Sequence, residues 1–265
     1  MFEPSLIRVL IFCFVLCACA VWEIQSPRRV LSQTKSLRWL NNLGLTGFNS
    51  VILSLVMPLL AIDAAQYANA HQLGLMNLAQ LSPWLNLVLS LLILDFAIYL
   101  QHVLFHRVPW LWRLHRMHHS DQDIDVTTGA RFHPVEILLS MLFKIALVLS
   151  LGVSVYGVLI FEIVLNACAM FNHSNAHLPL SVDHWLRKVV VTPDMHRIHH
   201  STIARETHSN FGFCLSCWDR WFNTYTAMPS QGHQQMQIGL PIFRQPREQW
   251  LDRMLTQPFR NGKIN

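Results

Sequence analysis

The chain has 265 residues, of which 52% are hydrophobic and only 13% charged, and its formal net charge is +5. Ordinary soluble domains carry about twice that share of charged residues, so the composition excludes this class and predicts an integral membrane protein. The modest positive charge fits basic loops beside anionic lipid headgroups, and it gives no reason to expect nucleic acid as a partner.

Four apolar stretches follow one another along the chain, at residues 5–21, 48–65, 83–105 and 135–171. Each of the first three has about the length of one membrane-spanning helix, since roughly 20 residues at a rise of 1.5 Å cross the hydrocarbon core. No linker, repeat or low-complexity tract divides the chain. Residues 1–265 are therefore predicted to form a single domain.

The fourth apolar stretch is too long for one spanning helix, and Gly152, Ser154 and Gly157 near its middle favour a tight turn. We therefore predict a helical hairpin. Lys144 and Glu162 lie equally far from the centre of this turn, so they should face each other and pair within the membrane. The predicted fold class is all-α: a polytopic membrane protein with about three spanning helices, a helical hairpin and a cytoplasmic helical cap that carries histidine clusters.

Basic residues predict the orientation of the chain in the membrane. Four of them follow the first apolar stretch: Arg28, Arg29, Lys35 and Arg38. The loop at residues 66–82, in contrast, has no Lys or Arg. Because cytoplasmic loops are enriched in Lys and Arg, the polar segments after the first, third and fourth stretches should face the cytoplasm, in a bacterial inner membrane or the endoplasmic reticulum.

A cleaved signal peptide is the alternative interpretation of the first stretch, because Ala18, Cys19 and Ala20 resemble a cleavage site. It is less favoured, since cleavage would leave the basic residues that follow on the translocated side. The six cysteines indicate no disulfide framework, and Cys214 with Cys217 forms a lone CxxC, which is a weak indication of a zinc or redox site.

Ten of the fifteen histidines fall into four short clusters, each at or beyond the predicted cytoplasmic end of an apolar stretch. The clusters are His102 and His106 in HVLFH; His115, His118 and His119 in HRMHH; His173 and His177 in HSNAH; and His196, His199 and His200 in HRIHH. On a helix, residues i, i+3 and i+4 share one face, so each cluster should aim its imidazoles in one direction.

Imidazole binds iron, zinc, copper and nickel, and ten such ligands exceed what one ion can hold. We predict two metal ions, each held by about five of the ten histidines, with a coordination position left for water or dioxygen. A haem protein with two axial histidines is the main metal-binding alternative, but it has no use for adjacent pairs of histidines.

The order HxxxH, HxxHH, HxxxH, HxxHH among apolar hairpins resembles the fatty acid hydroxylase and sterol desaturase superfamily of integral membrane di-iron oxidases. The sequence TGARFHPVE at residues 128–136 looks like the RxHPxE element of that family. Glu206, NFGF at residues 210–213 and WDR at residues 218–220 look like the segment after its last histidine cluster. The resemblance covers about residues 95–225, roughly half of the chain. His208 departs from the pattern, and whether it contacts metal is left open.

This resemblance implies two iron ions that activate dioxygen as co-substrate and oxidise an aliphatic C–H bond of a lipid, with zinc able to replace iron in purified protein. Hydroxylation is favoured. Desaturation and ether-lipid cleavage stay open as alternatives, because the motifs do not show how the reacting carbon is positioned. No nucleotide-binding fingerprint, haem-attachment motif or ferredoxin cysteine set is present, so a separate electron donor of cytochrome or ferredoxin type is expected.

Two other classes of protein fit the sequence less well. A metal transporter would spread its ionisable ligands across the depth of the membrane, whereas these clusters are predicted at one face. A zinc-dependent membrane hydrolase would need a general-base carboxylate, as in HExxH, and this motif is absent.

Six polar residues are candidates for supporting the metal ligands: Asp95, Tyr99, Arg131, His133, Asp194 and Asn210. Asp95 and Tyr99 share a helical face with His102, so Asp95 is a candidate to accept a hydrogen bond from a ligand histidine; the alternative is a cap or water-cavity residue. Arg131 and His133, with Glu136, either line the site or anchor the hairpin at the membrane interface. Asp194 is either a helix N-cap or a neighbour of the ligands, and Asn210 belongs to the segment that resembles the family.

Overall fold

Five long apolar helices dominate the computed structural model, which describes residues 4–262. They are α1 (Pro4–Gln25), α2 (Lys35–Val56), α5 (Pro83–Arg107), α7 (Pro134–Leu151) and α8 (Val155–His173). Each lies in a segment that is long and apolar enough to cross a membrane. The all-α, polytopic membrane fold predicted from the sequence is confirmed.

The second apolar stretch is not the single helix that was predicted over residues 48–65. The helix α2 begins earlier, at Lys35, and ends at Val56, and α3 (Ala61–Ala70) follows after a break. Pro58 lacks a backbone N–H and disfavours helical geometry at Met57, which is extended with φ −112° and ψ 97°. The short helix α4 (Leu75–Leu78) then leads into α5.

The predicted hairpin is confirmed. Gly152 ends α7 in the left-handed conformation, with φ 71° and ψ 44°, and the Ser154 side chain caps the start of α8. The Lys144 ammonium lies 2.8 Å from a Glu162 carboxylate oxygen across the hairpin. A Cβ on Gly152 would lie 2.6 Å from the carbonyl oxygen of Leu73. The hairpin turn and the loop before α4 therefore meet closely at one end of the bundle, and glycine is required there.

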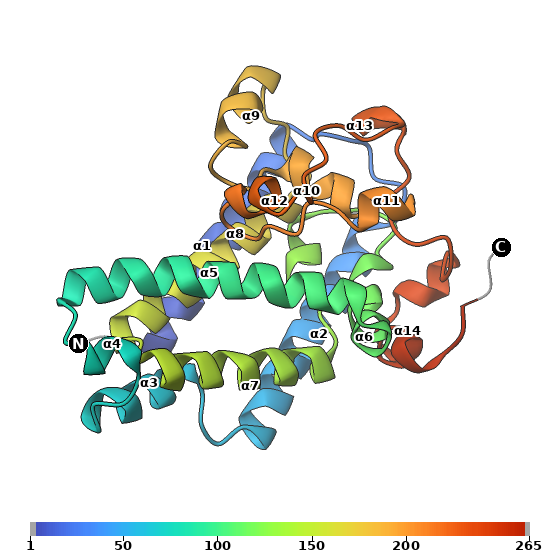
Figure 1. Ribbon diagram of the computed structural model, residues 1–265. Coiled ribbons are helices and arrows are strands. Elements are labelled where there is room, and N and C mark those ends of the chain that lie inside the picture. Colours follow the sequence, from blue (N-terminus) through green and yellow to red (C-terminus); the bar gives the residue numbers. More distant parts are fainter. Residues whose placement is uncertain (1–3, 263–265) are drawn as a thin grey trace.

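Short helices cover the other end of the bundle. They are α6 (Pro109–His119), η1 (Val126–Ala130), α9 (Leu180–Leu186), α10 (Pro193–His199), α11 (Ala204–Thr207), α12 (Cys217–Trp221), α13 (Gly232–Gln235), η2 (Pro246–Gln249), α14 (Leu251–Thr256) and η3 (Gln257–Phe259). Figure 1 shows the orange and red segments on the upper and right-hand side of the view, away from α3 and α4 at the lower left. They form a cap over the ends of α5 and α8.

The first helix packs into the same body as the others. Its Trp22 ring stacks on Phe171 of α8 with the ring centroids 6.3 Å apart, and Cys19 and Ala20 join Met170 in a buried apolar cluster. Beyond the helix, the Arg28 guanidinium donates two hydrogen bonds of 2.9 Å to the Asp194 carboxylate of α10. The N-terminal segment thus contacts both the bundle and the cap.

Candidate metal centre

Nine of the ten predicted ligand histidines are buried together where the bundle meets the cap. They come from four short stretches of chain: the end of α5, the last turns of α6, the end of α8, and α10 with its C-cap residue. Because α10 begins at Pro193 with the Thr192 hydroxyl as its N-cap, the HRIHH sequence falls on helical turns, and its histidines share one side.

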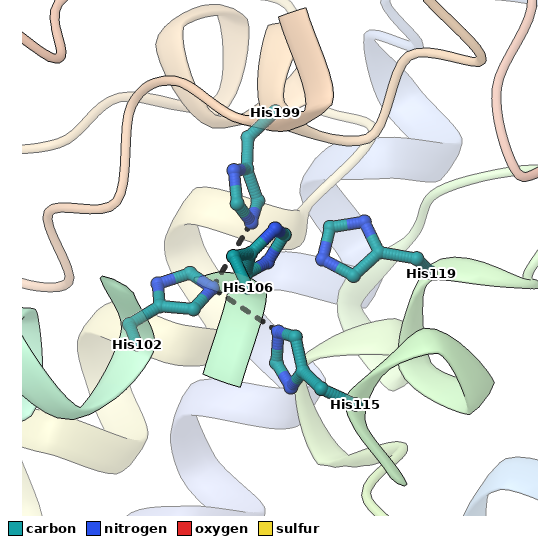
Figure 2. Close-up of side chains that lie close together, drawn as sticks. All are labelled: His102, His106, His115, His119 and His199. Carbon is teal, nitrogen blue, oxygen red and sulfur yellow. Dashed lines mark hydrogen bonds between the residues drawn. The ribbon is translucent and has the colours of Figure 1, made fainter. Parts of the chain in front are cut away.

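The nine imidazoles form two groups, and in each group the potential ligand atoms all lie within 4.8 Å of one another. Group 1 consists of His102, His106, His115, His119 and His199, and group 2 consists of His118, His173, His196 and His200. Figure 2 shows the rings of group 1 pointing toward a common centre from α5, α6 and α10. Each group therefore combines residues that are far apart in the sequence.

The tenth predicted ligand, His177, is not brought to this cluster. The helix α8 ends at His173, and Ser174 is already extended, with φ −61° and ψ 145°. The four-residue spacing of HSNAH therefore does not place both histidines on one helical face, and His177 is exposed on the surface. His208, in contrast, is exposed but approaches group 1, since its Nδ1 lies 3.3 Å from Nδ1 of His106.

Protein acceptors fix the orientation of five imidazoles through their Nδ1 atoms. Four of these acceptors are backbone carbonyls, which lie 2.9 Å from His102, 3.1 Å from His118, 2.7 Å from His173 and 2.7 Å from His199. The fifth is the Glu136 carboxylate, 2.7 Å from Nδ1 of His115. Because a carbonyl accepts only, the proton is placed on Nδ1 and Nε2 is left as the ligand atom.

The buried histidines of the cap are held neutral, which is the form that binds metal. Burial, and then the neighbouring imidazoles, lower the pKa of His118, His119 and His200 well below the ordinary histidine value. The same two causes act on His196 in α10. At neutral pH these side chains therefore carry a free ring nitrogen rather than a positive charge.

The spacing of the nitrogens fits ligands of a shared metal ion. Two nitrogens bound to one ion at about 2.1 Å lie about 3.0 Å apart at a right angle and about 3.4 Å apart at a tetrahedral angle. In group 1, Nε2 of His102 lies 3.1 Å from Nε2 of His115 and 3.0 Å from that of His199. In group 2, Nε2 of His173 lies 3.1 to 3.2 Å from Nε2 of three other histidines: His118, His196 and His200.

Several buried ring nitrogens also have no hydrogen-bond partner among residues 4–262. They include Nε2 of His106 and both ring nitrogens of His119. Unpaired polar atoms in a buried site are costly, so a bound ion would offset an otherwise unfavourable arrangement. Both groups are therefore suited to hold a metal ion.

A family model described as fatty acid hydroxylase matches residues 87–224 of the chain. This range is just over half of the sequence and contains all nine clustered histidines. The chain belongs to the fatty acid hydroxylase family. The resemblance that the histidine pattern and the RxHPxE element suggested is thereby confirmed.

Curated relatives from this family are similar to parts of the chain. It is 33% identical over 149 residues to the ornithine lipid hydroxylase of Rhizobium tropici, covering 54% of this chain and 42% of the relative. It is 31% identical over 154 residues to human alkylglycerol monooxygenase, covering 58% and 33%. It is 27% identical over 194 residues to rat cholesterol 25-hydroxylase, covering 71% and 61%. The chain thus spans less than half the length of the first two, and no solved structure matches it.

Asp95 does not contact a histidine in this member of the fatty acid hydroxylase family. Its carboxylate accepts hydrogen bonds from the backbone N–H of Cys214 and Leu215, both at 3.2 Å, and from the Trp218 indole at 2.8 Å. Tyr99 hydrogen-bonds to Thr224 instead, at 3.0 Å. Both residues therefore tie α5 to the segment after the last histidine cluster, and their hydrogen bonds reach the histidine groups only through that segment.

The RxHPxE element contacts the histidine groups at two of its positions. The Arg131 carbonyl accepts the hydrogen bond from His118, and Glu136 accepts the one from His115. His133 lies apart from the histidine groups, where its ring caps α7 and contacts the Leu255 carbonyl oxygen at 3.2 Å. Arg131 and Glu136 thus contact the histidine groups, whereas His133 does not.

The remaining two candidates stabilise the backbone around the histidine groups. Asp194 is not the N-cap of α10, which is Thr192; it pairs with Arg28 and Arg197. Asn210 adopts a left-handed conformation with φ 53°, and its side-chain amide donates to the Met195 and Thr226 carbonyls at 3.0 and 2.9 Å. Asn210 therefore fixes the turn between Ser209 and Phe211, whose backbone carbonyls orient His199 and His102.

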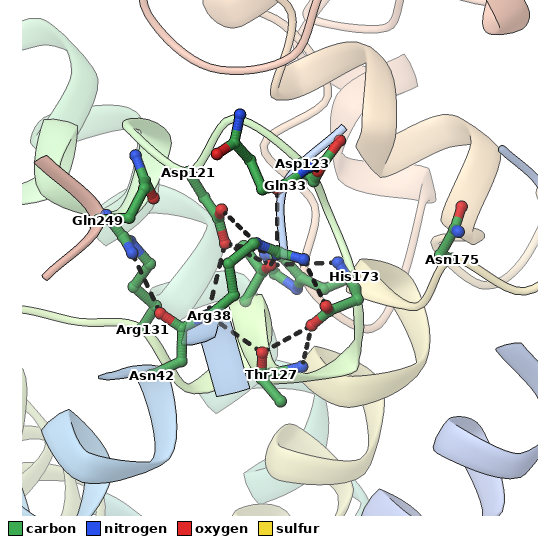
Figure 3. Close-up of polar contacts among 12 residues, drawn as sticks. Gln33, Arg38, Asn42, Asp121, Asp123, Thr127, Arg131, His173, Asn175 and Gln249 are labelled. Carbon is green, nitrogen blue, oxygen red and sulfur yellow. Dashed lines mark hydrogen bonds and ion pairs between the residues drawn. The ribbon is translucent and has the colours of Figure 1, made fainter. Parts of the chain in front are cut away.

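A buried polar network supports His118 and was not predicted from the sequence. Figure 3 shows Arg38 and Arg131 beside Asp121. Arg38 donates two hydrogen bonds to Asp121, at 2.9 and 2.8 Å, and one to Asp125 at 2.5 Å. Although burial opposes it, the charge of Arg38, and then that of Arg131, lowers the pKa of Asp121 to about 2. The network thus fixes the loop whose Arg131 carbonyl orients His118.

Proposed function

We propose that this chain is a membrane-bound, dioxygen-dependent oxidase that uses two iron ions to hydroxylate an aliphatic C–H bond of a lipid. The observation that carries the proposal is the position of the two histidine groups. A cavity of ≈330 Å³ reaches both groups and continues between the apolar helices, with His102, His118 and His173 among its lining residues. A hydrocarbon chain in this cavity would lie against the metal centre.

Iron is proposed because the reaction requires a redox-active ion. Imidazole groups accept iron, copper and zinc, but zinc has no redox chemistry. When bound, the iron pair would supply the activation of dioxygen: one oxygen atom enters the C–H bond, the other leaves as water, and two electrons and two protons are consumed. Zinc bound to purified protein would occupy the same histidines, but it would not support the reaction.

The residues of the chain would supply positioning rather than acid–base chemistry. The cavity wall is largely apolar, so it can orient a hydrocarbon and exclude water from the reacting carbon. The buried Glu136 carboxylate and the backbone carbonyls hold the imidazoles in place before substrate arrives. Of the carboxylates that line the cavity, Glu136 is the one at the metal end, and it is engaged with His115.

A separate electron donor, of cytochrome or ferredoxin type, is proposed to dock on the cap at the cytoplasmic face. The exposed His208 lies 3.3 Å from His106 of group 1, and the neighbouring Arg107 and Arg205 are also exposed. An acidic donor that binds this surface would contact His208, which lies next to the proposed ligand His106. Turnover with a purified donor should fall steeply as salt rises from low to physiological concentration. Turnover without any reductant, or turnover that salt does not affect, would contradict this assignment.

The proposed activity is tested by lipid mass spectrometry of cells that express the wild type, His118→Ala or His199→Ala under ¹⁸O₂. The wild type should produce lipids that carry one labelled oxygen atom, and both variants should lose this product. Dehydrogenated lipids without label would instead indicate desaturation. If both variants keep full iron and full activity, the site is wrongly assigned.

A further inference from the structure

The cavity extends from the histidine groups into the bundle of membrane-spanning helices. Along α8 its lining residues recur on one helical face: Glu162, Leu165, Asn166, Ala169, Met170 and His173. His173 belongs to group 2, and Glu162 lies 173 − 162 = 11 residues earlier in the same helix. At 1.5 Å per residue this stripe is about 16 Å long. The cavity therefore joins the metal centre to a point deep in the bundle.

That deep end is formed by three charged side chains. Glu162 is buried and accepts a hydrogen bond from Lys144 at 2.8 Å, and its other carboxylate oxygen lies 3.0 Å from the Arg8 guanidinium. Arg8 and Lys144 both line the cavity, with side chains that are 32% and 13% exposed. Two positive charges thus face one negative charge, which leaves the cluster with a net charge of +1.

An unbalanced positive charge within membrane-spanning helices is costly unless an anion accompanies it. Among the described residues, Glu162 is the one side-chain partner of Arg8 and of Lys144. A guanidinium has five N–H donors and an ammonium has three, so most donors of both side chains stay available. Between this cluster and the histidines the lining includes apolar residues such as Ile98 and Met141, together with the uncharged polar residues Gln101, Ser140 and Asn166. The cavity is therefore cationic at one end and uncharged, with a mainly apolar wall, along the rest of its length.

We propose that Arg8 and Lys144 bind the ionised acidic group, a carboxylate or a phosphate, of the lipid substrate. The hydrocarbon chain of that lipid then runs along α8 to the metal centre. This inference rests on the proposed function and makes it more specific, because the C–H bond that reacts lies roughly 16 Å from the acidic group rather than next to it. Arg8 precedes the part of the chain that matches the family model, so the site is built partly outside the matched range.

The test is equilibrium binding of radiolabelled hexadecanoate, hexadecyl phosphate and hexadecanol to the purified full-length protein in detergent. The wild type should bind at least one of the two acids more tightly than the alcohol. Lys144→Met and Arg8→Met should each weaken binding of that acid by about tenfold or more, since a hydrogen bond to a charged group contributes about 1.5–3 kcal/mol. Their affinity for hexadecanol should not change. Preference for one acid identifies the carboxylate or the phosphate as the ligand.

Two further variants separate this role from a structural one. Glu162→Gln removes the competing carboxylate and should tighten binding of the acid, which a misfolded protein cannot do. Lys188→Met removes a positive charge from an exposed position outside the cavity and should have no effect. Equal losses for acid and alcohol in Lys144→Met, weaker acid binding in Glu162→Gln, or no preference in the wild type would each overturn the proposal. Because binding needs no turnover, a selective but inactive protein would refute the proposed oxidase function alone.

Discussion

Removing group 2 or group 1 should lower the iron content of the purified protein from two ions per chain to one. His173→Ala should do so for group 2, because its Nε2 lies within 3.1 to 3.2 Å of the other three Nε2 atoms and only three ligands remain. The double substitution of His102 and His199 by alanine should do so for group 1, because it removes two imidazoles whose Nε2 atoms lie 3.0 Å apart and leaves three of the five. Iron per chain is measured by elemental analysis after purification.

The matched control is His177→Ala, which removes a histidine from the same HSNAH sequence but from an exposed position outside both groups. This variant should keep both ions and its activity. Retention of two ions in the His173 variant would show that group 2 does not hold a separate ion. Loss of an ion in the His177 variant would instead show that the ligand set extends to the surface.

Arg38→Met should destabilise the protein by about 3–5 kcal/mol, because it leaves the carboxylates of Asp121 and Asp125 buried without their cation. The free energy of unfolding is measured in detergent by denaturant titration. The double variant with Asp121→Asn should recover part of the loss, since one of the unpaired charges is then removed. A loss below about 1 kcal/mol would show that water or another group replaces Arg38.

The pH dependence of the wild type provides a second measurement on the same network. The folded-state pKa of Asp121 is lowered to about 2, whereas an unfolded aspartate has a pKa of about 3.9. Its contribution to stability is therefore fully present above about pH 4 and is lost as the pH falls through about 2. In Arg38→Met this acid-dependent part of the stability should be reduced.

The hairpin was predictable because its signals are local. Gly152 and Ser154 mark the turn, and Lys144 with Glu162 set its register through charge pairing alone. The nine buried histidines were predictable for a related reason, since the spacing of HxxxH and HxxHH describes one helical face. The same rule failed for His177, because α8 ends at His173 and residues beyond the end of a helix do not share a helical face with those inside it. Pro58 is a local signal for the break after α2, whereas the apolar length of the stretch alone predicts an uninterrupted helix over residues 48–65.

The supporting contacts could not be predicted from spacing. Asp95 was a candidate to contact a histidine because it shares one face of α5 with His102, but its partners come from a loop more than a hundred residues later in the chain. The acceptors for His102 and His199 are carbonyls of Phe211 and Ser209, and a backbone carbonyl has no sequence signature. Such contacts depend on how distant segments meet, which a single sequence leaves open.

Both groups of histidines draw on parts of the chain that leave the ribosome at very different times. His102 and His106 emerge before the hairpin, whereas His196, His199 and His200 follow it, and each group needs members from both sides. A nascent chain that has inserted only its first helices can therefore hold neither ion in a complete site. If iron binds at both groups as proposed, its loading would be a late step of maturation, after the last spanning segment has entered the bilayer and the cap has folded back over it.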